Sequence, residues 1–515
     1  MKGEENRKIL WWPLWTLWGL GVAGIFLGYL LGGDVSRQQG VMRNMAIAIA
    51  CLTLSLFWLL LFSRLAWRKR LLFLGILGST ALISVSLFRF EGVSGDLVPI
   101  IKWRWASVER AEVGDIGVKG ASVDGAYPQF LGPNRNATVT GIDLSLDWSV
   151  DKPKLLWRQP IGEAWSGFAT SGFRAITQEQ DGEDELITCY HLLTGERLWE
   201  SRMAARYDNP LGGVGPRATP TIDGDRVYAV GATGALSCLD LQTGERLWGF
   251  NILEKHGAKL PDWGVAGSPL VYEDLVVLSP GGRDGNSLVA YDKSSGSVVW
   301  SGGSDRAHWS SPVLHEIEGE KQVLIFNGSG VAAHRLDDGS VEWEYPWKRS
   351  TGTPRVAIPV KTPGNRFVVS SGYGAGADLF QVSKTSGGFS ATQQWRSLHL
   401  KSKFNNFVYK DGYLYGLDDG VMACIDGETG RRTWKKGRYG HGQLILGDDW
   451  LLLMAENGEV VLFEPNPEAP IELGRFEALE GKTWNPPALA GSYLLLRNHL
   501  QAACFKLPIL PEQGE

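Results

Sequence analysis

Cysteine and histidine are scarce in this sequence, and their spacing excludes several common kinds of site. The 515 residues include five cysteines and eight histidines. No two cysteines are adjacent, and no Cys-x-x-Cys-His motif for attaching haem occurs. No two histidines lie three or four residues apart, the spacing that presents two metal ligands on one helix face. The sequence therefore predicts neither a haem nor a helical metal site.

Positive charge is also scarce in most of the chain. The net charge is -5, but residues 1–90 contain ten Lys or Arg against three acidic residues, which leaves -12 for the rest. Such an acidic domain is poorly suited to nucleic acid, so no nucleic-acid partner is expected. Long amphipathic helical patterns are missing after about residue 100, whereas Gly (65) and Trp (22) are abundant. This composition predicts a mostly β fold for the larger part of the chain.

Three apolar runs near the N-terminus lack any charged side chain. They cover about residues 11–31, 45–62 and 71–88, and each is long enough to cross about 30 Å of hydrocarbon as a helix. Spans without ionisable groups indicate an anchor rather than a transporter or a proton path. Residues 1–90 are therefore predicted to be a membrane anchor with three transmembrane α-helices.

Basic residues predict the orientation of this anchor. They gather before the first span and between the second and the third: Lys2, Arg7, Lys8, Arg64, Arg68, Lys69 and Arg70. By the positive-inside rule these segments lie in the cytoplasm, so an odd number of spans puts the rest of the chain across the membrane. In a bacterium that compartment is the periplasm. Residues 91–123 are predicted to be a linker; in the alternative interpretation, residues 98–105 (VPIIKWRW) lie on the outer leaflet.

A short phrase of the form Asp-x-x-Thr-Gly-x-x-x-Trp recurs along the acidic part of the chain. Clear copies end at Trp199, Trp248, Trp300 and Trp434, and weaker copies end at Trp343 and Trp395. A strand ends near the Asp, the Gly supplies a positive φ in the turn, and the next strand carries the Trp. Because one hairpin cannot bury such a Trp alone, neighbouring repeats must stack on it. These tryptophans, together with Trp157, are predicted to be structural blade anchors.

A second phrase, a small or polar residue that opens a strand, confirms the period. Its copies begin at Trp165, Thr219, Ser268, Ser311, Ile358, Asn405, Gly442 and Pro486. Eight units of about 45 residues, each with four short strands, are typical of a β-propeller. The last unit stops after its third strand, and an isolated strand around Trp157 precedes the first unit. We therefore predict an all-β, eight-bladed β-propeller over residues 124–515, with four-stranded antiparallel blades and the N-terminal strand closing the ring.

The cysteines occupy equivalent places in these units. Cys189, Cys238 and Cys424 each lie ten residues before a blade tryptophan, and Cys504 is on the corresponding strand of the last unit. A disulfide framework is one interpretation of four such cysteines. Equivalent positions in different blades are too far apart for the Cα separation of about 5.5 Å that a disulfide needs, so buried free thiols are expected.

The repeated phrase resembles the pyrroloquinoline quinone (PQQ) repeat. Residues Tyr127 to Asn136 (YPQFLGPNRN) are similar to the segment that precedes the propeller in many bacterial PQQ-like proteins. The resemblance covers about residues 124–507. That superfamily includes quinoprotein alcohol and glucose dehydrogenases and also the BamB-like scaffold propellers, which use no cofactor. Short blades, the lack of adjacent cysteines and the lack of a haem motif favour the BamB-like branch.

The residues just before each opening phrase are expected to surround one mouth of the central channel. Two residues of the loop Pro280 to Gly285 are added to them as candidates for specificity. The candidate binding residues are Trp165, Arg217, Trp263, Arg283, Asp284, His308, Trp309, Arg355, Asn405, Asn406, His441, Trp484 and Asn485. They suit a surface that binds carboxylates or peptide carbonyls through Arg and aromatic area through Trp. Alternatively, the Trp side chains fill the channel and the Arg side chains bind strand-end carbonyls.

The sequence thus favours a bacterial inner-membrane protein with a periplasmic propeller. The expected function is a binding or scaffold module for an unknown protein or peptide, without catalytic residues, metal or cofactor. The alternative is a PQQ-dependent membrane dehydrogenase that oxidises an alcohol or sugar and uses PQQ with calcium. No nucleophile elbow accompanies the serines of the opening phrases, which excludes a hydrolase of that type.

Overall fold

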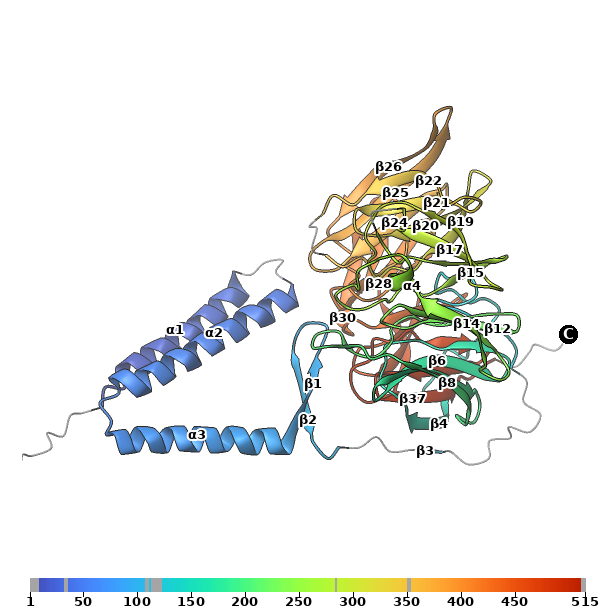
Figure 1. The fold of residues 1–515 in the computed structure, drawn as a ribbon. Helices are drawn as coiled ribbons and strands as arrows, with labels where there is room; N and C mark the ends of the chain where they lie inside the picture. The colour runs from blue at the N-terminus through green and yellow to red at the C-terminus, as the bar shows by residue number, and fades with distance from the viewer. Residues whose placement is uncertain are drawn as a thin grey trace, which may run out of the picture. The chain divides into compact units, whose positions relative to one another are not determined.

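The computed structural model describes residues 9–31, 36–106, 111–112, 123–282, 285–349 and 353–510. The chain divides into two compact units, Met1–Ser107 and Val108–Glu515. The first unit is helical and the second is a β-propeller (Figure 1). The two units are described one after the other.

Three helices form most of the first unit: α1 (Trp12–Leu30), α2 (Arg37–Phe57) with a π-helical continuation η1 (Trp58–Phe62), and α3 (Trp67–Leu87). All three are long and apolar enough to cross a membrane. The second helix begins at Arg37 rather than at the predicted Met45, because the hydroxyl of Ser36 caps it by accepting from the Gln39 N–H at 3.3 Å. Helices α1 and α2 pack together, and Trp18 Nε1 donates to Ser55 Oγ at 3.1 Å.

A β-hairpin follows α3 without a break. Its strands are β1 (Phe88–Val93) and β2 (Pro99–Trp103), so the predicted linker over residues 91–123 begins as ordered structure. Polar and apolar residues alternate from Phe88 to Glu91 and from Ile101 to Trp103, which is the pattern of a two-sided ribbon. After β2 the chain is described as far as Ala106. Beyond it, only Ala111–Glu112 and Val123 of the predicted linker are among the described residues.

Eight blades of antiparallel strands form the second unit, as predicted (Figure 1). The first four blades are β5 (Ala169–Ser171), β6 (Arg174–Asp181), β7 (Asp184–His191) and β8 (Arg197–Ala204); β11 (Thr221–Asp223), β12 (Arg226–Val230), β13 (Ala235–Asp240) and β14 (Arg246–Asn251); β15 (Leu270–Tyr272), β16 (Leu275–Leu278), β17 (Leu288–Asp292) and β18 (Val298–Gly302); and β19 (Val313–Ile317), β20 (Glu320–Phe326), β21 (Gly330–Arg335) and β22 (Val341–Pro346). Two short elements interrupt the connecting loops, the ribbon of β9 (Asp208–Asn209) with β10 (Gly213–Val214) and the helical turn α4 (Ile252–Lys255).

The next three blades have the same order. They are β23 (Val360–Thr362), β24 (Arg366–Ser371), β25 (Gly376–Thr385) and β26 (Gly388–Ser397); β27 (Val408–Lys410), β28 (Tyr413–Asp418), β29 (Val421–Asp426) and β30 (Arg432–Arg438); and β31 (Gln443–Leu446), β32 (Leu451–Met454), β33 (Glu459–Glu464) and β34 (Ile471–Glu477).

The eighth blade joins the two ends of the propeller. Three of its strands come from the C-terminal end, β35 (Ala488–Ala490), β36 (Tyr493–Arg497) and β37 (Gln501–Lys506), and the fourth is β4 (Lys154–Pro160). Cys504 pairs with Trp157, which confirms the predicted closure by the N-terminal strand. A fifth, outermost strand that was not predicted, β3 (Ala111–Glu112), pairs with β4.

The repeated Trp connects each blade to the next. Trp300 Nε1 donates to the Leu336 carbonyl of the following blade at 2.7 Å, and a Cβ on Gly339 would lie 2.3 Å from the Trp300 ring. The same bond joins five other pairs: Trp157 to Leu192, Trp199 to Leu241, Trp248 to Lys293, Trp395 to Gly427 and Trp434 to Asn466. The turn is held by its Asp, whose Oδ1 accepts from the Thr side chain and backbone, as at Asp240 and Thr243. The phrase is therefore one inter-blade contact.

Two blades depart from this rule. Trp343 donates instead to Gln322 of its own blade at 2.7 Å, although it still packs against Phe367. The seventh blade has no Trp on its outer strand, and Trp148 from the segment before the propeller packs against Gly474 in that place. Trp148 is buried, so a distant part of the chain supplies the missing ring.

The five cysteines are free and buried. Cys189, Cys238, Cys424 and Cys504 pair directly with the blade tryptophans across adjacent strands. Ala290 takes the same place opposite Trp300. A small side chain is needed there beside the large ring, which confirms the prediction of structural thiols.

A belt of hydrogen bonds joins the innermost strands around the whole ring. Its members are Gly167 N to Thr219 Oγ1 (3.1 Å), Thr219 N to Ser268 Oγ (2.9 Å), Ser268 N to Ser311 Oγ (2.9 Å), Ser310 Oγ to Ala357 O (3.1 Å), Ile358 N to Asn406 Oδ1 (2.9 Å), Gln443 Nε2 to Phe404 O and Trp484 O (both 2.9 Å), and Asn485 Nδ2 to Ser166 O (2.8 Å). In six of the eight units a polar side chain at or beside the opening phrase makes this bond to a neighbouring blade, whereas the first and fifth units contribute backbone atoms.

Candidate binding face of the propeller

The two faces of the propeller carry different loops. Because successive strands are antiparallel, the loops that enter each first strand share one face with the loops that join the second strand to the third. We call this the mouth face, and the other, which carries the Asp-x-x-Thr-Gly turns, the turn face. The candidate residues predicted from the sequence belong to mouth-face loops. The candidates Arg283 and Asp284 lie outside the described residues.

Residues 127–139 cross the channel at the turn face. The Pro128 carbonyl accepts from Ile222 N in the second blade at 2.7 Å. Arg135 donates to the Ser268 carbonyl of the third blade at 3.0 Å, and the Ala137 carbonyl accepts from Leu446 N of the seventh blade at 2.8 Å. The third and seventh blades lie opposite each other in a ring of eight. This segment therefore spans the channel and closes it at the turn face.

Five aromatic rings meet at the mouth face: Trp165, Trp263, Trp309, Phe404 and Trp484. We call them the aromatic plate. The ring centroids of Trp263 and Trp309 are 4.7 Å apart, those of Trp263 and Phe404 are 6.0 Å apart, and Phe404 and Trp165 each lie 4.9 Å from Trp484. These rings come from five different blades, including the third and the sixth. The four predicted mouth tryptophans therefore lie in one group that covers the channel.

The two predicted mouth arginines bind carbonyl groups of their own loops. Arg217 donates to the carbonyls of Gly212 at 3.0 Å, Gly213 at 2.8 Å and Gly215, and its guanidinium lies 4.4 Å from the Tyr207 ring centroid. Burial lowers the pKa of Arg217 to about 10, although it remains charged at neutral pH. Arg355 is 1% exposed and donates to the Thr353 carbonyl at 2.5 Å. These contacts match the alternative in which the arginines bind strand-end carbonyls.

The remaining predicted residues are polar side chains that hold the loops. Asn406 and Asn485 belong to the hydrogen-bonded belt, and Asn405 Oδ1 accepts from Lys403 N at 3.0 Å. His441 is buried, and its backbone N–H donates to Glu456 Oε2 at 3.0 Å. His308 Nδ1 accepts from Arg355 N at 3.4 Å. Burial, with Arg355 and Arg306 nearby, lowers the pKa of His308 to about 3, so this imidazole is neutral.

Sequence reasoning missed two buried lysines and the fifth ring of the plate. Lys482 Nζ lies 4.3 Å from the Trp484 ring centroid and 4.7 Å from that of Trp165. Lys403 Nζ lies 4.5 Å from the Tyr373 ring centroid and 5.4 Å from that of Phe404. Each lysine stands two residues before a predicted mouth residue, and Phe404 directly precedes Asn405. Extending each mouth position by two residues toward the N-terminus would have found all three.

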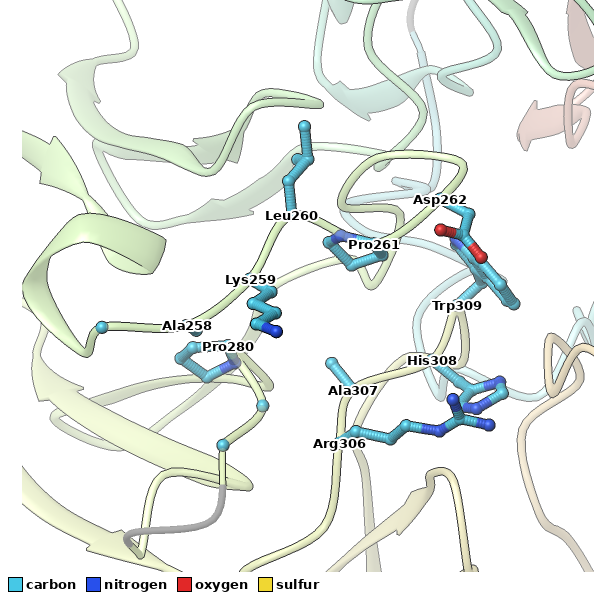
Figure 2. A pocket seen from close by; sticks show the side chains of 13 residues that line it. Ala258, Lys259, Leu260, Pro261, Asp262, Pro280, Arg306, Ala307, His308 and Trp309 are labelled. Atoms are coloured by element: carbon cyan, nitrogen blue, oxygen red, sulfur yellow. The ribbon is translucent and has the colours of Figure 1, made fainter. Parts of the chain in front are cut away.

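A pocket of about 760 Å³ opens on the mouth face between the third and fourth blades. Its walls are the segments 257–262, 280–282 and 306–309 (Figure 2). Figure 2 shows the Lys259 side chain on one wall, with Arg306 and His308 together on another. Apolar surface comes from Leu260, which is 48% exposed, and from Trp309 of the aromatic plate. The pocket thus combines two cationic side chains, Lys259 and Arg306, and one carboxylate, Asp262, with apolar walls on an otherwise acidic domain.

The centre of the mouth can be compared with what a quinone cofactor needs. Among the described residues, no group of three or more His, Cys, Asp or Glu side chains could hold a metal ion. PQQ carries three carboxylates and a planar ring system, so it needs guanidinium groups that face it and an open aromatic surface. The Arg217 guanidinium faces its own loop, and the rings of the plate lie against one another. Arg217 and the aromatic plate therefore do not offer this cofactor a ready site.

Comparisons with known proteins identify the fold family. A family model described as "Outer membrane protein assembly factor BamB" matches residues 183–436. The structure of BamB from Moraxella catarrhalis is similar, with a TM-score of 0.51 and 13% identity, over 69% of this chain and 100% of that one. No curated protein sequence matches this chain.

Two enzymes have the same fold. The quinohemoprotein alcohol dehydrogenase from Comamonas testosteroni has a TM-score of 0.51 and 12% identity, over 78% of this chain and 84% of that one. The quinohemoprotein alcohol dehydrogenase ADHIIG from Pseudomonas putida HK5 has a TM-score of 0.52 and 11% identity, over 76% and 81%. At such identities the likeness concerns the fold alone. The repeated phrase and the family-model match over residues 183–436 support a PQQ-like β-propeller family for this propeller, and the solved structures share its fold.

Proposed function

We propose that this protein is a membrane-anchored binding module whose propeller holds a protein partner at its mouth face. The three apolar helices support the anchor, and the basic residues around them support a cytoplasmic N-terminus with the propeller in the bacterial periplasm. The observation that carries the proposal is the pocket beside the aromatic plate. It has the size of a ligand site, and Trp309 of the aromatic plate is one of its lining residues.

The pocket chemistry favours one kind of partner segment. Lys259 and Arg306 outnumber the one acidic lining residue, Asp262, in a domain that is acidic as a whole, so the pocket favours a carboxylate. Leu260 and Trp309 offer apolar contact next to these cations. The pocket volume of about 760 Å³ is larger than the volume of one side chain and can hold a few residues of a partner. The partner segment is therefore an extended or looped stretch in which an acidic residue stands beside an apolar one.

The enzyme alternative has less support. A quinoprotein dehydrogenase needs a bound metal, a base near the cofactor and a cover that excludes water. The described mouth residues hold their own loops instead, as Arg217 and His441 do. We propose that the protein functions without PQQ or calcium.

Photo-crosslinking tests the binding proposal. A benzoylphenylalanine at Leu260 in the full chain, activated in intact cells, should give a discrete adduct. The same group at Val299, which is exposed on the outer strand β18, should give none. Lys259→Glu with Arg306→Glu should remove the adduct, whereas Lys152→Glu with Lys436→Glu, an equal charge change at exposed residues outside the pocket, should not. A Leu260 adduct that survives reversal of both pocket charges, or no adduct, contradicts the proposal.

A cofactor titration tests the alternative. The full chain purified in detergent is incubated with PQQ and calcium, and dye reduction is followed with alcohols and sugars. We expect neither stoichiometric PQQ nor substrate-dependent reduction. Tightly bound PQQ with turnover would show that the protein is a dehydrogenase and would contradict the proposal of a binding module without cofactor. Arg217 and Arg355 are unsuitable for such tests because their removal would release the loops they hold.

A further inference from the structure

The hairpin after α3 has one face made of apolar side chains. Across its two strands Phe88 pairs with Trp103 and Phe90 with Ile101. Because paired residues point to the same side of a ribbon, all four side chains share one face. They are between 41% and 63% exposed, and the rings of Phe88 and Trp103 meet edge to face with centroids 5.3 Å apart. Trp105, itself exposed, extends this face, because its ring centroid lies 5.3 Å from that of Trp103.

The opposite face of the hairpin carries three charged residues beside Ile100. Arg89 pairs with Lys102 across the strands, and Glu91 accepts from Arg89 at 2.9 Å and contacts Lys102 Nζ at 3.0 Å. The hairpin is therefore an amphipathic ribbon, with aromatic and aliphatic groups on one side and a small ion-pair network on the other. A two-stranded hairpin alone is only marginally stable in water, and an exposed apolar side adds to this cost.

The hairpin is fixed to the ends of two helices. Its first residue follows directly on the last residue of α3, Leu87. After β2, Arg104 N donates to the Leu87 carbonyl at 2.9 Å and Arg104 Nη2 donates to the Val85 carbonyl at 2.7 Å. At the hairpin turn, Asp96 lies 3.5 Å from Nε of Arg37, the first residue of α2. The ribbon is thus attached where α3 leaves the apolar layer and α2 enters it.

We infer that the hairpin lies on the membrane surface, with Phe88, Phe90, Ile101 and Trp103 inserted among the lipid headgroups and the first acyl carbons. The inference rests on the proposed anchoring by α3, since a strand that continues a spanning helix begins at the membrane boundary. Aromatic side chains prefer this depth, and Arg89 and Lys102 on the other face reach water or phosphate. The occupant of the apolar face is therefore lipid. By binding the membrane surface, the hairpin fixes the depth at which the chain leaves the bilayer.

Neighbouring residues on opposite faces provide a matched test. Spin labels are attached to Ile101→Cys and Lys102→Cys in the full chain, reconstituted in phosphatidylethanolamine and phosphatidylglycerol vesicles. Collision rates with oxygen and with a water-soluble nickel complex are then measured. The five native cysteines are buried, and wild-type protein treated with the label gives the background. We expect a several-fold higher ratio of oxygen to nickel collisions at residue 101 than at residue 102. Phe90→Cys should repeat the result on the other strand.

A label at Leu82→Cys, exposed on α3, separates this inference from the anchoring itself. If residue 82 is in lipid while residues 101 and 90 are both exposed to the nickel complex, the hairpin stands in water and the inference is wrong. Labels at 101 and 90 that meet neither reagent would show that protein covers the face, which also overturns it. If residue 82 meets the nickel complex, the proposed membrane anchoring fails.

Discussion

At the scale of the residue, one tryptophan ring holds each pair of neighbouring blades. Trp300 is buried between the third and fourth blades and donates to the Leu336 carbonyl. Replacing it with Ala leaves a cavity and an unpaired carbonyl, so Trp300→Ala should lower the free energy of unfolding by about 3–5 kcal/mol. Thermal unfolding of the full chain in detergent, followed by near-ultraviolet circular dichroism, measures this. Val299→Ala, at the exposed neighbour, should change little; equal effects of the two substitutions would contradict the assignment.

The glycine under each ring has a second role beyond its backbone conformation. Gly339 and Gly224 both have positive φ, +73° and +57°, so an Ala at either position is strained. Only Gly339 lies against a ring, where a Cβ would be 2.3 Å from Trp300; around Gly224 there is open space. Gly339→Ala should therefore lower the unfolding midpoint clearly more than Gly224→Ala. Similar shifts would show that strain alone, and not the ring contact, explains the glycine.

Glu185 couples the stability of the first two blades to pH. It is 1% exposed, accepts from Ala232 N at 3.1 Å with one oxygen, and has no hydrogen-bond partner at Oε2. Burial raises the pKa of Glu185 to about 7, against smaller opposing effects of the Ala232 N–H and Arg217. Because this folded-state pKa is above the unfolded value, the linked stability is full below about pH 4.5 and is lost as pH rises through 7.

Glu185→Gln removes this titration. The variant should gain stability relative to wild type as pH rises from 5 to 8, by at most about 3 kcal/mol. Unfolding midpoints of both proteins at four pH values in this range test the prediction. A difference between the two that stays constant across the range would show that Glu185 does not titrate there.

At the scale of the element, strand β4 completes the ring. It provides the fourth strand of the eighth blade, and Trp157 on it reaches the first blade. Deleting residues 151–160 leaves the edge of β37 unpaired and opens the ring, so cooperative unfolding should be lost. Substituting Pro for both Ala111 and Glu112 disturbs only the outermost strand β3 and should leave the transition cooperative. A deletion variant that melts like wild type would show that β4 is dispensable.

The blades could be predicted because their interactions are local or repeated. The Asp, Thr, Gly and Trp of each phrase make the same contacts in blade after blade, so their spacing carries the information. Trp148 could not be predicted as a substitute in the seventh blade, because it reaches Gly474 from a distant segment. The β1–β2 hairpin was missed because its alternation is short and follows a membrane span.

The mouth of the channel was predictable in position but not in detail. The predicted tryptophans do gather there, since the period places them all at the same end of the first strands. Whether Arg217 faces a ligand or its own loop depends on the conformation of residues 212–215, which no sequence pattern reveals. Binding at this face stays a prediction that the crosslinking experiment decides.

At the scale of the whole molecule, the basic residues predict a single topology. Lys2, Arg7 and Lys8 precede α1, and further basic residues lie between α2 and α3, so the N-terminus should be cytoplasmic and Glu515 periplasmic. A reporter enzyme that is active only outside the cytoplasm, fused after Glu515, should be active. A fusion at the same place to a reporter that is fluorescent only in the cytoplasm should be dark; the opposite pair of results would reverse the topology.

The closure of the ring by β4 has a consequence during synthesis. Strand β4 leaves the ribosome before the first complete blade, but its partner β37 comes after all the other described strands. At about 5–20 residues per second, β4 waits on the order of tens of seconds with an open edge. The seven contiguous blades can form during that time as a growing arc. A chain whose synthesis ends before β37 therefore forms an arc with unpaired edges at both ends. We expect such a product to aggregate rather than to work as a smaller propeller.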